Sequence, residues 1–151
     1  MRRGLARVRS LAGLDRWLLW EAFFLVAGLR IGLRLLPFRG VRRIVDTLAG
    51  GRAPTAAGGA RGQGVMICQI TLSVNAVSGL LRAMCLPRAL AVHIMMARRR
   101  LPSDLRIGVS RAPGEALEAH AWVEDESGVV FGSLPDQSRF VPLPAPALRT
   151  S

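Results

Sequence analysis

The chain has 151 residues, a length that fits one domain with an additional arm. Half of the residues are hydrophobic but only 5% are aromatic, so the core must be built mainly from aliphatic side chains and Met. The formal net charge is +11 and every cation is an arginine, which excludes an acidic surface and suits the capture of carboxylate or phosphate groups. The alternative interpretation is a solvated basic surface without a partner.

Cysteine usage and the N-terminal apolar run indicate the compartment. Cys68 and Cys85 are too few for a disulfide scaffold. The apolar run behind the N-terminal arginines contains Glu21, Arg30 and Arg34, and no small-residue cleavage site follows a clean apolar stretch. These features argue against a cleavable signal and against a spanning helix in this run. We therefore expect a cytoplasmic protein.

Residues 1–49 are predicted to form an N-terminal helical arm. Apolar residues recur at helical spacing from Leu14 to Leu36, and Asp15 can cap the start of this helix. A second, shorter helix is predicted from Val41 to Leu48.

The arm is apolar on one side and arginine-rich on the other. Such a segment packs on the core, binds a partner or lies on a membrane surface. The acidic residues Glu21 and Asp46 would be repelled by anionic lipid, which favours packing or partner binding over membrane contact.

Residues 50–64 are rich in glycine and have no periodic apolar pattern, which predicts a flexible linker between the arm and a core at 65–151. Two further helices are predicted, from Val65 to Arg82 and from Cys85 to Arg100. The Val, Ile and Thr content of the first leaves a strand at its start as an alternative. Pro87 lies in the first turn of the second, where its missing N–H costs nothing.

The apolar period then changes to two, which is typical of strands with one buried face. Strands are predicted from Leu105 to Ser110, from Glu118 to Glu124 and from Val129 to Phe131. Ser127-Gly128 is expected to join the last two as a hairpin. The proline-containing last dozen residues predict an extended tail.

A helix that begins at Cys85 and a later strand that carries His120 form the candidate catalytic pair. A thiol at a helix N-terminus faces the positive end of the helix dipole and several free N–H groups, which stabilise the reactive thiolate. A histidine within reach can take the thiol proton and return it to a leaving amine. The alternative for Cys85 is a small buried hydrophobe, and this alternative dominates for Cys68 within its apolar run.

Other uses of these residue types are less consistent with the sequence. His93 follows Cys85 by eight residues on the same predicted helix, about 12 Å along the axis, so their side chains cannot meet. The cysteines and histidines lack the close paired spacing of zinc sites. The glycine-rich segment lacks the Lys-Ser/Thr ending of a phosphate-binding loop. We therefore expect no metal and no cofactor.

Three segments carry a resemblance to a known family: Cys85 to Leu101, Leu105 to Val109, and Glu118 to Glu124 with its Ala-His-Ala-Trp sequence. They resemble the transglutaminase-like leader peptidases of lasso-peptide gene clusters, and Leu36-Pro37-Phe38 is similar to the end of that family's N-terminal arm. The resemblance implies an α+β fold with a papain-like or transglutaminase-like core. In such a core, a helix bearing the cysteine packs on a small antiparallel sheet bearing the histidine.

The resemblance also implies the activity and the partners. A cysteine endopeptidase of this family removes the leader peptide from a ribosomally synthesised lasso-peptide precursor. It acts with a leader-recognition protein, here expected to be a separate chain, and with an ATP-dependent cyclase that closes the macrolactam. No nucleic-acid-binding motif accompanies the positive charge, so no nucleic-acid partner is expected.

The resemblance assigns roles to three residues of the third segment and the helix start. Cys85 is the implied nucleophile and His120 the implied general base. Trp122 lies two residues further along the same strand face, where it either lines the substrate site or fills the core.

The third member of the implied Cys-His-Asp triad departs from the family pattern. An Asp is expected on the strand that pairs with the His120 strand, but this sequence has Gly132 and Ser133 there. Asp136 is the nearest acid downstream and our choice of orienting residue, with Glu124 as the alternative. Because loss of the acid lowers the rate greatly, a second hypothesis is a catalytically weak or inactive scaffold that binds the precursor or the cyclase.

Overall fold

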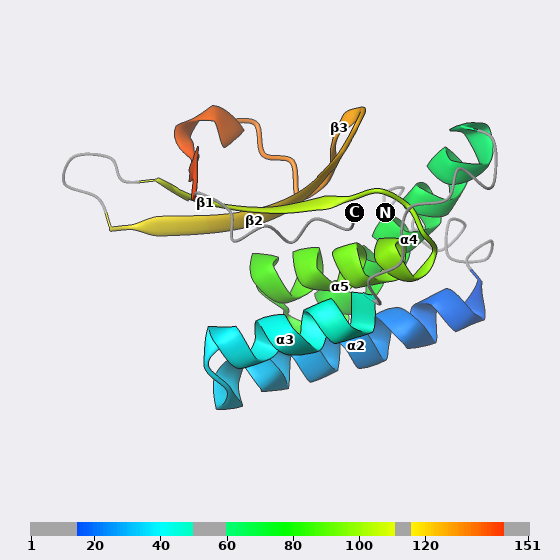
Figure 1. Ribbon diagram of the computed structural model, residues 1–151, viewed down its shortest axis with the longest axis horizontal. Helices are drawn as coiled ribbons and strands as arrows, with labels where there is room; N and C mark the ends of the chain where they lie inside the picture. Colours follow the sequence, from blue (N-terminus) through cyan, green and yellow to red (C-terminus); the bar gives the residue numbers. More distant parts are fainter. Residues whose placement is uncertain (1–14, 50–59, 111–115, 144–151) are drawn as a thin grey trace, which may run out of the picture.

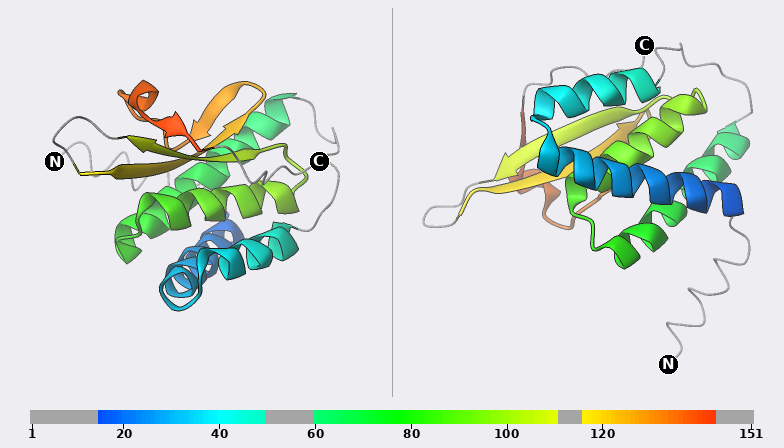
Figure 2. Two further views of the ribbon diagram at one scale, coloured as in Figure 1. Left: turned by 60° about the vertical axis from the view of Figure 1, so that its left-hand side comes forward. Right: turned by 90° about the horizontal axis from the view of Figure 1, so that it is seen from below.

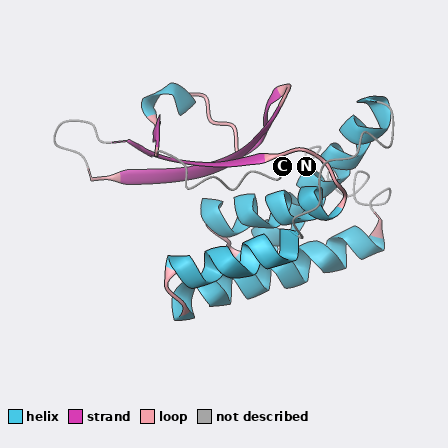
Figure 3. Cartoon of the chain, viewed as in Figure 1, coloured by secondary structure: helices cyan, strands magenta, loops and turns pink. Residues whose placement is uncertain are grey.

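The computed structural model describes residues 15–49, 60–110 and 116–143. The expected α+β class is confirmed: helices pack on one four-stranded antiparallel sheet (Figures 1 and 3). The described elements are, in chain order, the helices α2 (Arg16–Leu35), α3 (Phe38–Ala49), α4 (Ala60–Leu81) and α5 (Cys85–Arg98), the strands β1 (Asp104–Ser110), β2 (Glu118–Asp125) and β3 (Gly128–Phe131), the 3-10 helix η1 (Gln137–Arg139) and the strand β4 (Val141–Pro142).

Helix α2 begins one residue after its cap, as its sequence predicts. The carboxylate of Asp15 accepts a hydrogen bond from the backbone N–H of Trp17 at 3.0 Å, which satisfies one of the free donors of the first turn. Four residues at helical spacing are fully buried: Leu18, Ala22, Val26 and Leu29. This face packs against α4 and α5, so the predicted arm shares one core with the rest of the chain.

Helix α4 begins at Ala60, earlier than the sequence predicts, so residues 60–64 are helical and not part of a linker. Glycine lowers helix stability without forbidding the conformation, and the packing of Ile70, Val74 and Val77 in the core stabilises the helix as a whole. The rest of the predicted linker, 50–59, lies outside the described residues, as does the turn predicted at 112–114.

The structure also shows a property of α4 that the sequence analysis missed. Among the described residues, the stretch Gly62–Leu81 is the one helical segment long and apolar enough to cross a membrane by length and composition, and 28% of it is buried. Core helices of soluble proteins meet the same criterion, and α4 contributes Ile70 and Val74 to this core.

Helix α5 lies in the middle of the molecule, between the sheet and the layer formed by α2 and α3 (Figures 1 and 2). Pro87 and every residue of the stretch 89–97 are buried. His93 belongs to this buried stretch, and its Nδ1 lies 2.9 Å from the hydroxyl of Ser103. This histidine is therefore part of the core, on the same helix as Cys85.

The strands lie in the order β3-β2-β1-β4 with antiparallel neighbours. The longest pairing joins β1 and β2 and sets Gly108 opposite His120. The hairpin between β2 and β3 forms as predicted, with a positive φ of 121° at Gly128. Strand β4 was not predicted: Val141 in the expected tail pairs with Val109 and adds a fourth strand.

Side chains alternate between the two faces of the sheet. Leu105, Ala121 and Val123 face the helices and belong to the main core. His120 and Trp122 therefore point to the opposite face, the side of the sheet on which η1 lies (Figure 1). On that face a Cβ at Gly108 would lie 2.9 Å from ring carbons of Trp122 and 3.0 Å from Cβ of Phe140. A glycine is needed where these aromatic side chains cross β1.

We predict that Gly108→Ala lowers the free energy of unfolding by about 1–3 kcal/mol, because the added methyl group overlaps the Trp122 ring. Gly28→Ala is the matched control, since Gly28 lies inside α2 with no atom within 4 Å of an added Cβ. It should raise the free energy of unfolding by about 0.5–1 kcal/mol. Urea unfolding measures both, and an unchanged midpoint for Gly108→Ala would show that the ring does not pack there.

Candidate functional site

Cys85 is the first residue of α5, as the sequence predicts. The preceding residue, Met84, caps the helix without a side-chain hydrogen bond, so its side chain leaves the backbone N–H groups of the first turn unoccupied. The half-buried thiol of Cys85 donates to the carbonyl oxygen of Ala119, with the sulfur 3.9 Å away. The helix start thus contacts strand β2 at the residue that precedes His120.

The imidazole of His120 is held by three neighbours. Its Nε2 lies 2.6 Å from the carbonyl oxygen of Gly132. Its ring stacks on Trp122 with centroids 5.9 Å apart and planes 14° from parallel, and Phe140 lies 5.5 Å away on the same face of the sheet. A carbonyl oxygen only accepts hydrogen bonds, so Nε2 carries a hydrogen here and Nδ1 is the basic nitrogen of the neutral ring.

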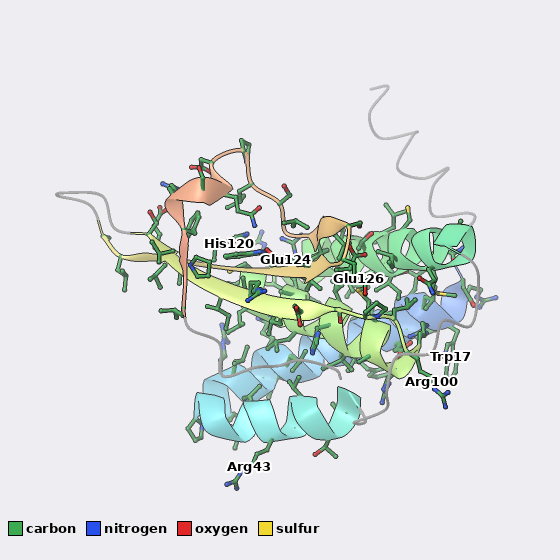
Figure 4. The ribbon with its side chains drawn as sticks, turned by 45° about the horizontal axis from the view of Figure 1, so that its top comes forward. Trp17, Arg43, Arg100, His120, Glu124 and Glu126 are labelled. Carbon is green, nitrogen blue, oxygen red and sulfur yellow. The ribbon has the colours of Figure 1, made fainter. Side chains whose placement is uncertain are left out.

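The structure brings the thiol to the histidine strand but does not join the two side chains. Cys85 approaches β2 from the helical side, where it packs against the main core. His120 leaves β2 on the other side, toward Phe140 (Figure 4). Within the described residues, the hydrogen bond of the imidazole is made to Gly132 and that of the thiol to Ala119.

Asp136, the predicted orienting acid, is bound elsewhere. Its carboxylate lies 2.8 Å from Nε of Arg139 and is exposed to solvent. Arg139 also binds Glu118 at 2.6 Å and lies over the ring of Phe140, 4.9 Å from its centroid. Asp136 therefore reaches His120 only indirectly in this structure, through the arginine and the phenyl ring.

Glu124, the alternative acid, is also engaged. Its Oε1 accepts a hydrogen bond from the indole N–H of Trp122 at 2.7 Å, and its Oε2 accepts one from Arg106 at 3.1 Å. Both oxygens of the carboxylate are thus taken by Trp122 and Arg106 and not by the imidazole. Trp122 itself is only 3% exposed, so its ring fills the space between the imidazole and β1.

Two positions near the site were missed by the sequence analysis. The analysis looked for a side chain opposite His120, whereas Gly132 offers its main-chain carbonyl, in a conformation with φ of 80° that glycine adopts easily. Arg88, three residues after Cys85, donates to Asn75 at 2.5 Å and lies 5.5 Å from the Phe131 ring centroid. Arg88 could have been found from the sequence, because it follows Cys85 by three residues on one helix and this spacing puts two side chains on the same face.

The described residues contain no group of three or more His, Cys, Asp or Glu that could hold a metal ion.

Comparison with known proteins adds the family. A family model described as the transglutaminase-like superfamily matches residues 25–145, which is most of the chain. The chain belongs to the transglutaminase-like superfamily. Neither the curated proteins nor the solved structures contain a significant match. The family-level part of the resemblance is thus confirmed, together with the transglutaminase-like fold of helices packed on a four-stranded antiparallel sheet.

We predict that the neutral imidazole of His120 carries its hydrogen on Nε2, because that atom faces the Gly132 carbonyl. Long-range ¹H–¹⁵N correlation spectra report the tautomer directly, and His120→Gln assigns the signal because the chain has only two histidines. The same spectrum of Asp136→Asn should be unchanged. A ring protonated on Nδ1 would contradict the hydrogen bond to Gly132.

Proposed function

We propose that this superfamily member is a cysteine endopeptidase in which Cys85 is the nucleophile. The observation that carries the proposal is the position of this thiol: it is the first residue of a buried helix and contacts the main chain of β2 beside His120. The thiol is half-buried and not fully enclosed, so a substrate carbonyl can reach it. Membership of the transglutaminase-like superfamily supports thiol chemistry at this position.

The proposed reaction proceeds in two steps. Sγ of Cys85 attacks the carbonyl carbon of the scissile peptide bond, the C–N bond breaks, and the amine leaves with a proton while the acyl group stays on sulfur as a thioester. Water then attacks the thioester, and the carboxylic acid leaves as the thiol is restored. Backbone N–H groups of Cys85 and Leu86 are free to bind the oxyanion, whereas Pro87 has none to offer.

His120 is the proposed base, and Gly132 takes the place of the orienting acid. With Nε2–H held by the Gly132 carbonyl, Nδ1 is the nitrogen that accepts a proton. Because the imidazole of β2 and the thiol of α5 lie on different sides of β2, proton transfer requires the two to approach when substrate binds.

We further propose that the substrate is the leader region of a lasso-peptide precursor, cleaved in the cytoplasm with the help of a separate leader-recognition protein and before cyclisation by an ATP-dependent cyclase. The resemblance of the segments 85–101, 105–109 and 118–124 to the leader peptidases supports this assignment. A net charge of +11 also suits a substrate with acidic residues.

We predict that Cys85→Ala abolishes leader release, because it removes the proposed nucleophile. The fold should be kept, because the smaller alanine fits at this half-buried position. Purified chain is incubated with its precursor peptide and recognition protein, and the leader fragment is detected by mass spectrometry. Cys68→Ala is the matched control, since Cys68 is exposed on α4, and it should cleave like the unmodified chain. Full cleavage by Cys85→Ala would eliminate the proposal.

A second candidate function is a scaffold that binds the precursor or the cyclase without cutting. The observation that favours it is the placement of His120, whose imidazole is hydrogen-bonded to Gly132 and has no carboxylate partner among the described residues. A scaffold would retain the fold and the helix start but would not need a reactive thiol.

Alkylation by iodoacetamide separates the two functions. Cys68 is exposed and Cys85 only partly so, and accessibility alone would therefore make Cys68 react first. We predict that Cys85 reacts faster despite its lower exposure, because thiolate stabilisation outweighs access in a nucleophilic cysteine. Peptide mass mapping of timed samples gives both rates. Faster or equal labelling of Cys68 would support the scaffold.

A further inference from the structure

Helix α2 is apolar on two sides, of which only one is covered. Its inner side belongs to the core, whereas a second stripe faces solvent along nearly the whole helix. The stripe residues follow helical spacing and span about 27 Å. They are Trp17, Trp20, Phe24, Ile31 and Leu35, with exposed fractions of 73%, 57%, 67%, 57% and 77%. A soluble surface rarely carries a contiguous apolar stripe of this length without a partner.

Helix α4 extends this surface. No charged residue occurs in Gly62–Leu81, and Val65, Leu72 and Leu80 of this helix are exposed. Trp20 joins the two helices, because it lines a hollow of about 400 Å³ together with Val77 and Leu80 of α4. We call the exposed apolar residues of α2, together with the neighbouring Leu80 of α4, the α2–α4 surface.

The charges beside the α2–α4 surface are mostly positive, and Asp15 at the start of α2 is the exposed acid there. Glu21 is the single acid in α2 and, with Asp46 of α3, is one of the two acids that the sequence analysis set against contact with anionic lipid. In the structure its carboxylate is bound by Arg98 at 3.1 Å and by Arg99 at 2.6 Å, and its side chain is only 10% exposed. The acid is thus neutralised by arginines of α5. Arg16 and Arg34 remain exposed on α2 itself.

We propose that the α2–α4 surface binds the interface of an anionic membrane, with the helices lying along the bilayer. Indole rings partition to the headgroup level, the aliphatic side chains enter the acyl boundary, and guanidinium groups pair with lipid phosphates. A second copy of this chain is a poorer occupant, because each copy brings a net charge of +11. The polar groups among the stripe residues are Glu21 and Arg98, which line a hollow with Trp17, Trp20 and Phe24 and are already paired with each other, so the remaining exposed area of the stripe is apolar and suits a fluid apolar phase.

The fold restricts this contact to the membrane surface. The inner side of α4, with Ile70 and Val74, is fully buried in the same core as α2 and α5, so α4 cannot span a bilayer while the domain stays folded. The sheet lies on the other side of α5 from α2 (Figures 1 and 2). In Figure 4, Trp17 and His120 correspondingly lie on different parts of the molecule. Binding through α2 therefore leaves the sheet and the candidate site in water.

The test uses the full chain and vesicles of phosphatidylcholine with or without phosphatidylglycerol. Co-sedimentation should show binding to the anionic vesicles and about tenfold or more weaker binding to the neutral ones. Tryptophan emission should shift to shorter wavelength on binding. This shift reports on α2, since Trp17 and Trp20 are exposed whereas Trp122 is 3% exposed. The Cys85→Ala protein should bind equally well, so the result is independent of the proposed peptidase activity.

Matched triple variants locate the contact. Trp17→Ser, Trp20→Ser and Phe24→Ser together should lower vesicle affinity about tenfold or more, because they remove the exposed aromatic area. The control is Val129→Ser, Val141→Ser and Leu143→Ser, which removes exposed apolar side chains from the sheet region and should bind like the unmodified chain.

Four outcomes would overturn the proposal. The first is that the chain does not bind vesicles, and the second is that it binds neutral and anionic vesicles equally. The third is that both triple variants lose the same vesicle affinity. The fourth is that sedimentation velocity shows dimers of the unmodified chain but not of the aromatic variant. In the last case the surface joins two copies. Loss of leader-recognition protein binding in the aromatic variant, with no vesicle binding by the unmodified chain, would likewise assign the surface to a protein partner.

Discussion

The packing of α5 between the helical layer and the sheet is the contact on which the rest of the structure depends. The stretch 89–97 is buried on every side of the helix. An ordinary surface helix has charged residues on one face, whereas α5 has Ala, Met and Ile all round this stretch. This burial sets the helix at a fixed depth against β2. The first residue of the helix, Cys85, is thereby placed beside the main chain of β2, where its sulfur contacts the carbonyl oxygen of Ala119.

Much of this fold could be predicted from the sequence because the main patterns were long and periodic. Asp15 marked the start of α2, and the alternation after Leu105 marked the strands. The predictions failed where local chemistry and tertiary packing disagree. Glycines between 60 and 64 predict a linker, yet the core contacts of α4 carry the helix through them. Val141 looked like part of a tail, and only its pairing with Val109 makes it a strand.

The candidate site was predictable in its first member and less so in the others. A cysteine at a helix start can be recognised from Pro87 and the apolar period that follows it. Which residue after β3 lies near His120 depends on the β2–β3 register, which shifts between Val123 and Glu124, and the sequence pattern did not predict that shift. Likewise, a main-chain carbonyl such as that of Gly132 belongs to every residue type, so sequence reasoning can only name acids such as Asp136.

The burial of α5 has a consequence for how anything reaches the sulfur. With Pro87 and 89–97 covered, the lateral surface of the helix is largely closed, and solvent meets its leading turn and Arg98 at its other end. An incoming chain must therefore arrive end-on, along the helix axis, where the aligned peptide dipoles point outward and draw in the oxygen of a carbonyl group. A slender, unfolded segment satisfies that geometry, whereas the face of a compact protein would be held back by the flanking helices.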